Sequence, residues 1–167
     1  SRVNKVKAKE FDERLREVVD KYNTRDSLQF RSEEMAEFVD DLTEQVLDIL
    51  QDLEEDKNSF EEMGISYEEK AFYDILVKVR DEHGFPYADE KCLHLAKEIK
   101  KLVDDNSVYA DWAQRDDIRS QLNMDLTVLL YNNGYPPEWD EEVFEKVMEQ
   151  AENLKSQGSY EYAVIGI

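Results

Sequence analysis

The chain has 167 residues, of which 41% are hydrophobic and 11% aromatic, so it can bury a core and does not have the composition of a disordered chain. It carries 41 Asp and Glu against 21 Lys and Arg, a formal net charge of −20 at pH 7. Because nucleic-acid affinity grows with Lys and Arg contacts to phosphates, this balance argues against direct DNA binding by the chain itself. The acidity keeps the chain soluble or complements a basic protein partner.

Cys92 is the single cysteine, so no disulfide can form within the chain. A lone thiol fits a reducing compartment, and a small apolar core residue is the simplest role for it. No apolar run approaches the roughly 20 residues of a membrane-spanning helix, and no signal peptide is visible. We therefore expect a cytoplasmic protein without a membrane partner.

Two long helices are predicted in the first third of the chain. The first covers about residues 3–22, where apolar side chains recur at helical spacing. The second begins near Ser32, a candidate N-cap, and residues 58–65 are expected to form the connection that follows. The apolar stripe expected to be buried on the second helix is Met35, Phe38, Val39, Leu42, Val46, Ile49, Leu50 and Leu53.

The second helix is also strongly acidic. Between Asp40 and Glu62 there are ten acids and one base, Lys57. Such a run usually marks a solvated helix face. The alternative is a surface that binds a basic partner, and the sequence leaves both open.

A third helix is predicted to start at Ser66, which forms a capping box with Glu69. Gly84 is its natural stop, and Pro86 prevents an easy continuation. A fourth helix is expected from Asp89 to about residues 104–107.

A fifth helix is expected over about residues 113–132, where Asn133-Gly134 is a strong stop signal. The sixth should run to about Lys155. In the last residues, Tyr160, Tyr162, Val164 and Ile165 alternate as in a β-strand, although no partner strand is evident, so this tail either frays or pairs with another protein.

These elements predict an all-α protein, an irregular bundle of about six helices. We expect an N-terminal helical pair over residues 1–57, a four-helix domain over residues 66–157 and a tail over residues 158–167.

The common catalytic motifs are missing. There is no Gly-x-x-x-x-Gly-Lys loop for a nucleotide phosphate. His83 and His94 lack the Glu-x-x-His spacing of di-iron bundles, and there is no His-Glu-x-x-His zinc motif. The run Asp89-Glu90-Lys91 matches an acid-x-Lys nuclease pair by chance at a helix start. We expect no catalytic, metal or cofactor site in this chain.

Two aromatic segments are the candidates for protein recognition, because Trp, Tyr and Arg anchor many interfaces. One stands at the entry to the fifth helix and the other forms a stiff turn before the sixth. The alternative for both is packing: a Trp that fills the core and a turn that sets a helix angle. The interface candidates are Trp112, Arg115, Asp116, Tyr135, Pro136, Pro137 and Trp139.

Several segments occur in an order that resembles the C-terminal helical region of the R subunit of type I restriction enzymes. They are SYEEKAFYD from Ser66, DWAQRDDI from Asp111, NGYPP from Asn133 and VMEQAEN from Val147, with a less specific match at VVDKYN from Val18. These are packing and turn segments, so no catalytic residue is carried over.

The resemblance implies a bacterial or archaeal parent that is an ATP-dependent, site-specific deoxyribonuclease and DNA translocase. ATP and Mg²⁺ are expected only in that parent, and DNA is reached only through its complex. The implied partners are the methyltransferase and specificity subunits, and the implied role of this region is to dock the R subunit onto them.

The residues alone leave a second interpretation open. The chain could be a free-standing acidic helical adaptor, or a DNA mimic that binds a basic protein. A metal-dependent hydrolase hidden among the acids is a third interpretation, for which we expect no activity.

Overall fold

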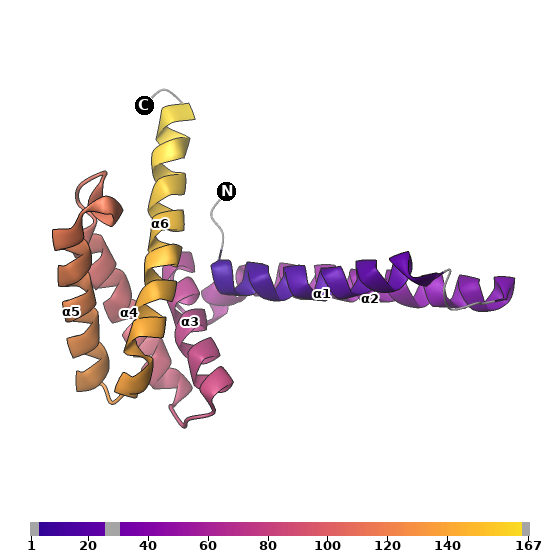
Figure 1. Cartoon of the computed structure of the whole chain (residues 1–167), viewed down its shortest axis with the longest axis horizontal. Helices are drawn as coiled ribbons and strands as arrows, with labels where there is room; N and C mark the ends of the chain where they lie inside the picture. The colour runs from indigo at the N-terminus through magenta and orange to yellow at the C-terminus, as the bar shows by residue number, and fades with distance from the viewer. Residues whose placement is uncertain (1–3, 26–30, 165–167) are drawn as a thin grey trace. The chain divides into compact units, whose positions relative to one another are not determined.

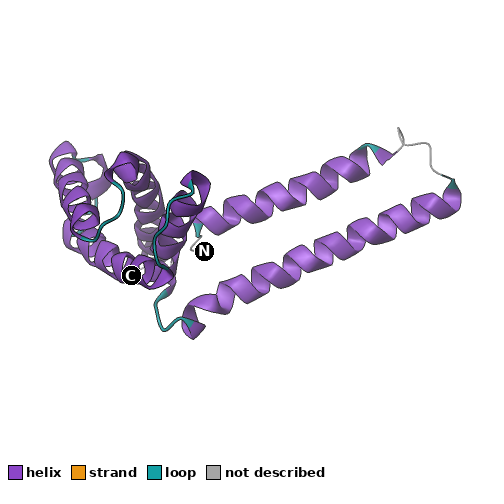
Figure 2. Cartoon of the chain, turned by 90° about the horizontal axis from the view of Figure 1, so that it is seen from below, coloured by secondary structure: helices purple, strands orange, loops and turns teal. Residues whose placement is uncertain are grey.

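The computed structural model describes residues 4–25 and 31–164, with side chains described as far as residue 154. Within those ranges the chain forms six α-helices, two short 3-10 turns and no strand (Figures 1 and 2). The predicted all-α fold of about six helices is confirmed. None of the described helices is long and apolar enough to cross a membrane.

The chain divides into two compact units. The hairpin unit is Lys7–Gly64, and the bundle unit combines Ser1–Val6 with Ile65–Ile167. The predicted division at residues 57, 66 and 158 remains a prediction, and each unit is described by itself below.

The hairpin unit contains most of α1 (Lys5–Asn23) and all of α2 (Ser32–Glu62). Its buried core is small: Val18, Leu42 and Ile49, against which Phe11, Phe38 and Val46 pack. The expected burial of the α2 stripe is wrong for Leu50 and Leu53, which are 54% and 42% exposed. A single neighbouring helix can bury only the residues that point directly at it, so the other residues of the stripe remain exposed to solvent.

Both ends of α2 differ from the prediction. Ser32 is the first helical residue and Arg31 is the N-cap, because the Glu34 carboxylate accepts the free Arg31 backbone N–H at 3.2 Å. Residues 58–62, predicted as a connection, continue the helix. The Asn58 and Ser59 side chains donate to the α2 carbonyls of Glu54 and Asp56, which is compatible with helix, and no breaker precedes Gly64.

The bundle unit contains α3 (Tyr67–His83), α4 (Asp89–Asn106), α5 (Asp116–Asn132) and α6 (Asp140–Val164), with the 3-10 turns η2 (Trp112–Gln114) and η3 (Pro137–Trp139). Its core gathers fully buried side chains from all four helices, among them Phe72, Ile75, Leu95, Ile99, Leu126 and Val147. Cys92 also lies in this core, where burial raises its thiol pKa to about 11.

The predicted start and stop of α3 are confirmed. The Glu69 N–H donates to Ser66 Oγ at 3.1 Å, and the Ser66 N–H donates to the Glu69 carboxylate at 2.8 Å. Gly84 closes the helix with a φ of +69°, a left-handed conformation that costs other residues energy, and donates to the Arg80 carbonyl.

Two predicted boundaries in the bundle unit are wrong. The fifth helix begins at Asp116 because Trp112–Gln114 form a separate 3-10 turn. The sixth continues to Val164, so the tail from Ser159, which was expected to fray or to pair as a strand, is a helix as far as the structure describes it. Residues 165–167 lie outside the described residues. A lone strand leaves its backbone groups without a ladder, whereas each residue added to a helix gains a hydrogen bond.

Candidate functional site

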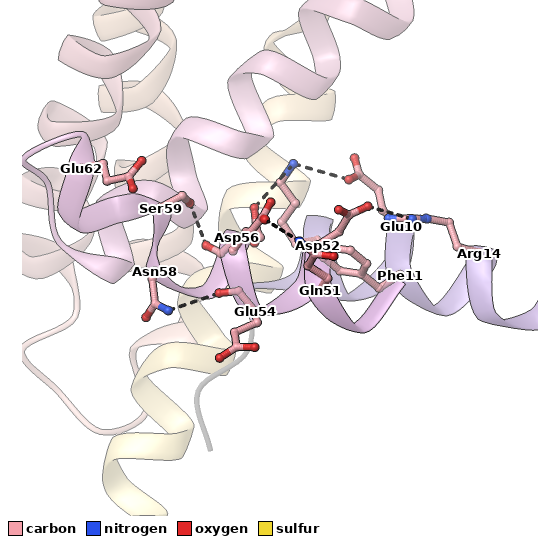
Figure 3. A pocket seen from close by; sticks show the side chains of 12 residues that line it. Glu10, Phe11, Arg14, Gln51, Asp52, Glu54, Asp56, Asn58, Ser59 and Glu62 are labelled. Atoms are coloured by element: carbon pink, nitrogen blue, oxygen red, sulfur yellow. Dashed lines mark hydrogen bonds and ion pairs between the residues drawn. The ribbon is translucent and has the colours of Figure 1, made fainter. Parts of the chain in front are cut away.

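An acidic groove lies along the hairpin unit between α1 and α2 (Figure 3). Its lining is dominated by carboxylates: Glu10, Asp52, Glu54, Glu55, Asp56 and Glu62. Arg14 pairs with Asp52 at 2.9 Å, and Lys7 lies 3.5 Å from Glu10 and 4.0 Å from Asp56. The groove offers no nucleophile paired with a base, so its chemistry is that of a negatively charged surface.

Most of this charge comes from α2. The helix contains thirteen Asp and Glu and one base, Lys57. The two bridges from α1 neutralise only a small part of it. The acidic face predicted for this helix is therefore present in the folded chain, and nearly all of its carboxylates are exposed to solvent.

The same unit exposes apolar side chains at helical spacing. We call them the hairpin rows: Leu15, Val19 and Tyr22 on α1, and Leu47, Leu50 and Leu53 on α2, each between 42% and 59% exposed. Residues 15, 19 and 22 recur at i, i+4 and i+7, which places them on one face of α1.

Both rows lie on one side of the hairpin. On α1 the helical repeat puts Arg14 on one flank of buried Val18 and Val19 on the other. On α2 it puts Asp52 on one flank of buried Ile49 and Leu50 on the other. Because Arg14 and Asp52 bridge the two helices on a single side, the rows share the opposite side.

Trp112 and Tyr135, two of the predicted interface residues, lie in the core of the bundle unit. They are 4% and 1% exposed. The Tyr135 hydroxyl donates to the Leu76 carbonyl at 3.0 Å, and burial raises its pKa. The structure gives both side chains the packing role that was the alternative to recognition.

The remaining interface candidates lie at or near the surface. Arg115 donates twice to the Asp117 carboxylate, at 2.8 and 3.2 Å, and these bonds lower the pKa of Asp117. Asp116 and Pro137 are exposed, whereas Pro136 and Trp139 are half-buried. An interface role for them remains a prediction.

Trp139 takes part in a cluster that the sequence did not indicate. Its ring stacks on His83 with centroids 3.5 Å apart, and His83 Nε2 lies 2.6 Å from the Glu142 carboxylate. With Glu82 these groups bring three potential metal ligands within 4.8 Å of one another. Because Glu142 is 59 residues from His83, no local spacing could reveal the cluster.

A buried polar group was also missed. Lys70 and Asp74, both 6% exposed, form an ion pair at 2.6 Å, and Asn4 donates to the same carboxylate at 2.8 Å. The backbone N–H of Lys5 donates to buried Gln150 at 2.7 Å. These contacts fix the first described residues to the bundle unit.

Comparison with known proteins shows similarity to one kind of enzyme subunit. Residues 1–157 match the family described as Type I restriction enzyme HindI endonuclease subunit-like, C-terminal. One relative is the type I restriction enzyme MjaIXP endonuclease subunit of Methanocaldococcus jannaschii, 30% identical over 132 residues, or 78% of this chain and 11% of that protein. Another is the type I restriction enzyme HindI endonuclease subunit of Haemophilus influenzae, 28% identical over 154 residues, or 92% of this chain and 14% of that protein.

The chain thus spans 11% and 14% of the length of these two relatives. No solved structure gives a significant match. The resemblance seen in the order of the sequence segments is confirmed by the family match and by both relatives.

Proposed function

The chain belongs to the Type I restriction enzyme HindI endonuclease subunit-like, C-terminal family, and we propose that it is an assembly module, which docks such a subunit onto the methyltransferase and specificity subunits of its complex. ATP-dependent DNA cleavage, with its ATP and Mg²⁺, then belongs to the rest of the parent polypeptide. DNA is reached only through the assembled complex.

The observation that carries this proposal is the pair of hairpin rows. Six large apolar side chains are exposed on one side of the hairpin unit, whose own core has only three buried residues among those described. Exposed apolar groups that cluster in this way mark interaction surfaces more often than groups scattered singly.

The charge around the rows indicates the chemistry of the partner. Thirteen acids on α2 would meet a partner whose apolar strip is bordered by Lys and Arg. Such complementarity speeds association and excludes acidic competitors, while the rows supply the buried area.

The test uses a full-length endonuclease subunit that ends in this region. The double variant Val19→Glu with Leu50→Glu places one charge in each row and should lose at least tenfold in affinity for the methyltransferase–specificity core. Gln51→Glu is the matched control, because it adds the same charge to α2 at an exposed position outside the rows and should bind as the parent does. Capture of the double variant at full strength would refute the docking role.

A second candidate function rests on the acidity of α2 alone. As a free-standing adaptor or DNA mimic, the chain would displace DNA from a basic protein and lose that ability as salt is raised. Competition that is insensitive to salt, or absent at low salt, rules this function out.

A further inference from the structure

An imidazole and two carboxylates meet in the bundle unit where α3 ends and α6 begins. Glu82 and His83 lie in the last turn of α3, and Glu142 lies in the first turn of α6. One ligand atom of each side chain lies within 4.8 Å of the other two, and His83 Nε2 lies 2.6 Å from the Glu142 carboxylate. We call these three residues the α3–α6 triad.

The donor atoms of the triad are of the kind that transition-metal ions prefer. An imidazole nitrogen with two carboxylate oxygens suits Zn²⁺ and related ions, whereas Mg²⁺ and Ca²⁺ prefer oxygen ligands alone. Zinc is often held by three protein ligands and a water molecule. We propose that the triad binds a divalent transition-metal ion such as Zn²⁺. This site is independent of the docking role proposed above, and it departs from the expectation that the chain has no metal site.

The distances between the ligand atoms are close to those that such an ion requires. With metal–ligand bonds of about 2.1 Å, the ligands of a tetrahedral ion lie about 3.4 Å from one another. The His83–Glu142 pair would open from 2.6 Å, and Glu82 lies within 4.8 Å of both. The ion would take the place of the hydrogen between His83 and Glu142, and rotations of the three side chains would seat it.

Trp139 holds the imidazole in position. Its ring stacks on that of His83 with centroids 3.5 Å apart and an angle of 7° between the ring planes. The side chains of His83 and Glu142 are also only 26% and 32% exposed. Ligands that are already held in place lose less freedom when the ion binds. The triad therefore differs from carboxylates that lie freely exposed on the surface.

The surrounding charge favours a cation. Residues 137–145 contain no Lys or Arg, and three further acids flank Trp139 and Glu142, namely Glu138, Asp140 and Glu141. Lys78 lies 3.5 Å from a Glu82 oxygen, so an ion would compete with this amine for Glu82. We therefore expect Glu82 to be the weakest of the three ligands and His83 and Glu142 to provide most of the affinity.

An ion at the triad would connect two helix ends that are distant in sequence, since His83 and Glu142 are 59 residues apart. A ligand that binds only the folded chain stabilises it. Zn²⁺ should therefore raise the midpoint of thermal unfolding of the bundle unit, and this rise should be lost when a triad ligand is removed.

The test is isothermal titration calorimetry of the 167-residue chain with Zn²⁺ at physiological ionic strength, where salt screens loose attraction to the acidic surface. The parent chain should bind one Zn²⁺ at the triad. His83→Ala and Glu142→Gln should each weaken this site at least about tenfold, since the loss of even an outer-shell partner costs a metal site about that much. His94→Ala removes the other histidine of the chain and is the matched control, which should bind as the parent does.

Two further measurements report on the site itself. The visible absorption of bound Co²⁺ depends on its ligands, so the spectrum of the parent chain should change in His83→Ala and persist in His94→Ala. Mg²⁺ in excess should not displace the Co²⁺. Circular dichroism confirms that each variant keeps its helices, and Glu142→Gln leaves the stack of His83 on Trp139 in place if His83→Ala disturbs the fold.

A parent chain that binds no Zn²⁺ overturns the proposal. So does binding that either triad variant leaves unchanged, an equal loss in His94→Ala, or displacement of Co²⁺ by Mg²⁺, which would indicate loose attraction to the acids. None of these results depends on the hairpin rows, so the failure of this proposal is distinguishable from the failure of the docking role.

Discussion

The two units of this protein are built from similar amphipathic helices but bury the apolar stripes of those helices to different extents. In the bundle unit, each helix stripe finds several neighbours, and residues such as Phe72, Leu95 and Leu126 are at most 1% exposed. In the hairpin unit, each helix has one neighbour, and Leu47 and Leu50 stay more than half exposed. An apolar stripe therefore identifies which face of a helix can be buried. The number of neighbouring helices decides whether that face is buried within the unit.

The largest contrast between the units should appear when a large apolar side chain is truncated in each. Phe72→Ala should destabilise the bundle unit by about 3–5 kcal/mol, through lost burial and a cavity. Leu50→Ala in the hairpin unit should change stability by less than about 0.5 kcal/mol. Denaturant unfolding followed by tryptophan fluorescence reports the bundle unit, because Trp112 and Trp139 both lie there. Circular dichroism of the same samples also reports the hairpin unit, because the helices of both units contribute to it. Equal losses for the two variants would remove the contrast.

Breaking the buried ion pair should have the next largest effect. Asp74→Ala removes the buried carboxylate that pairs with Lys70 and accepts a hydrogen bond from Asn4, at a cost of about 3 kcal/mol. Asp52→Ala is the surface control, since its pair with Arg14 is exposed and contributes about 0–1 kcal/mol. Thermal unfolding by circular dichroism measures both.

Tyr135 offers a smaller test of its packing role. Tyr135→Phe keeps the ring but removes the donor to the Leu76 carbonyl, which remains buried, so a loss of about 1–2 kcal/mol is expected. A urea titration of the chain measures this loss. Tyr131→Phe, on α5 with a side chain that is 72% exposed, should be neutral in that titration. A neutral Tyr135→Phe would show that the hydroxyl bond adds nothing to the bundle.

The smallest expected effect depends on pH. Partial burial raises the pKa of Asp140, and its Oδ1 has no hydrogen-bond partner among the described residues. The folded state thus holds the proton more tightly than the unfolded state, so this group's contribution to stability falls as pH rises above its usual pKa. Asp140→Asn should therefore gain stability relative to the parent chain between pH 4 and pH 7, by less than about 1 kcal/mol. A constant difference across that range would contradict the assignment.

Local signals in the sequence were sufficient to predict the helices of the bundle unit. The Ser66–Glu69 box, Gly84 and Asn133-Gly134 act through backbone groups within a few residues, so their spacing is decisive. The end of α6 was missed because the alternation at Tyr160 and Tyr162 resembles a strand. No partner strand is present among the described residues, so the helix continues instead.

The surfaces were harder to predict than the helices. Trp112 and Tyr135 have the residue types of interface anchors, but whether an aromatic side chain faces inward depends on helices far away in sequence. Among the hairpin rows, Leu50 and Leu53 belong to the stripe predicted on α2, whereas Leu47 does not. The periodicity of a stripe does not show whether a further helix covers it. The His83–Glu142 contact joins residues 59 positions apart, which a single sequence does not reveal.

The contacts of Asn4 and Lys5 with Asp74 and Gln150 show that the bundle unit is discontinuous in sequence. They anchor the chain in the bundle unit before α1 leaves it, and the chain returns to that unit at Ile65. The hairpin unit is thus inserted between two segments of the bundle unit, and none of its described side chains is part of the bundle core. A gene that replaces codons 7–64 with a glycine–serine linker should therefore still encode a folded bundle unit, and the hairpin unit should tolerate changes of length that the bundle helices would not.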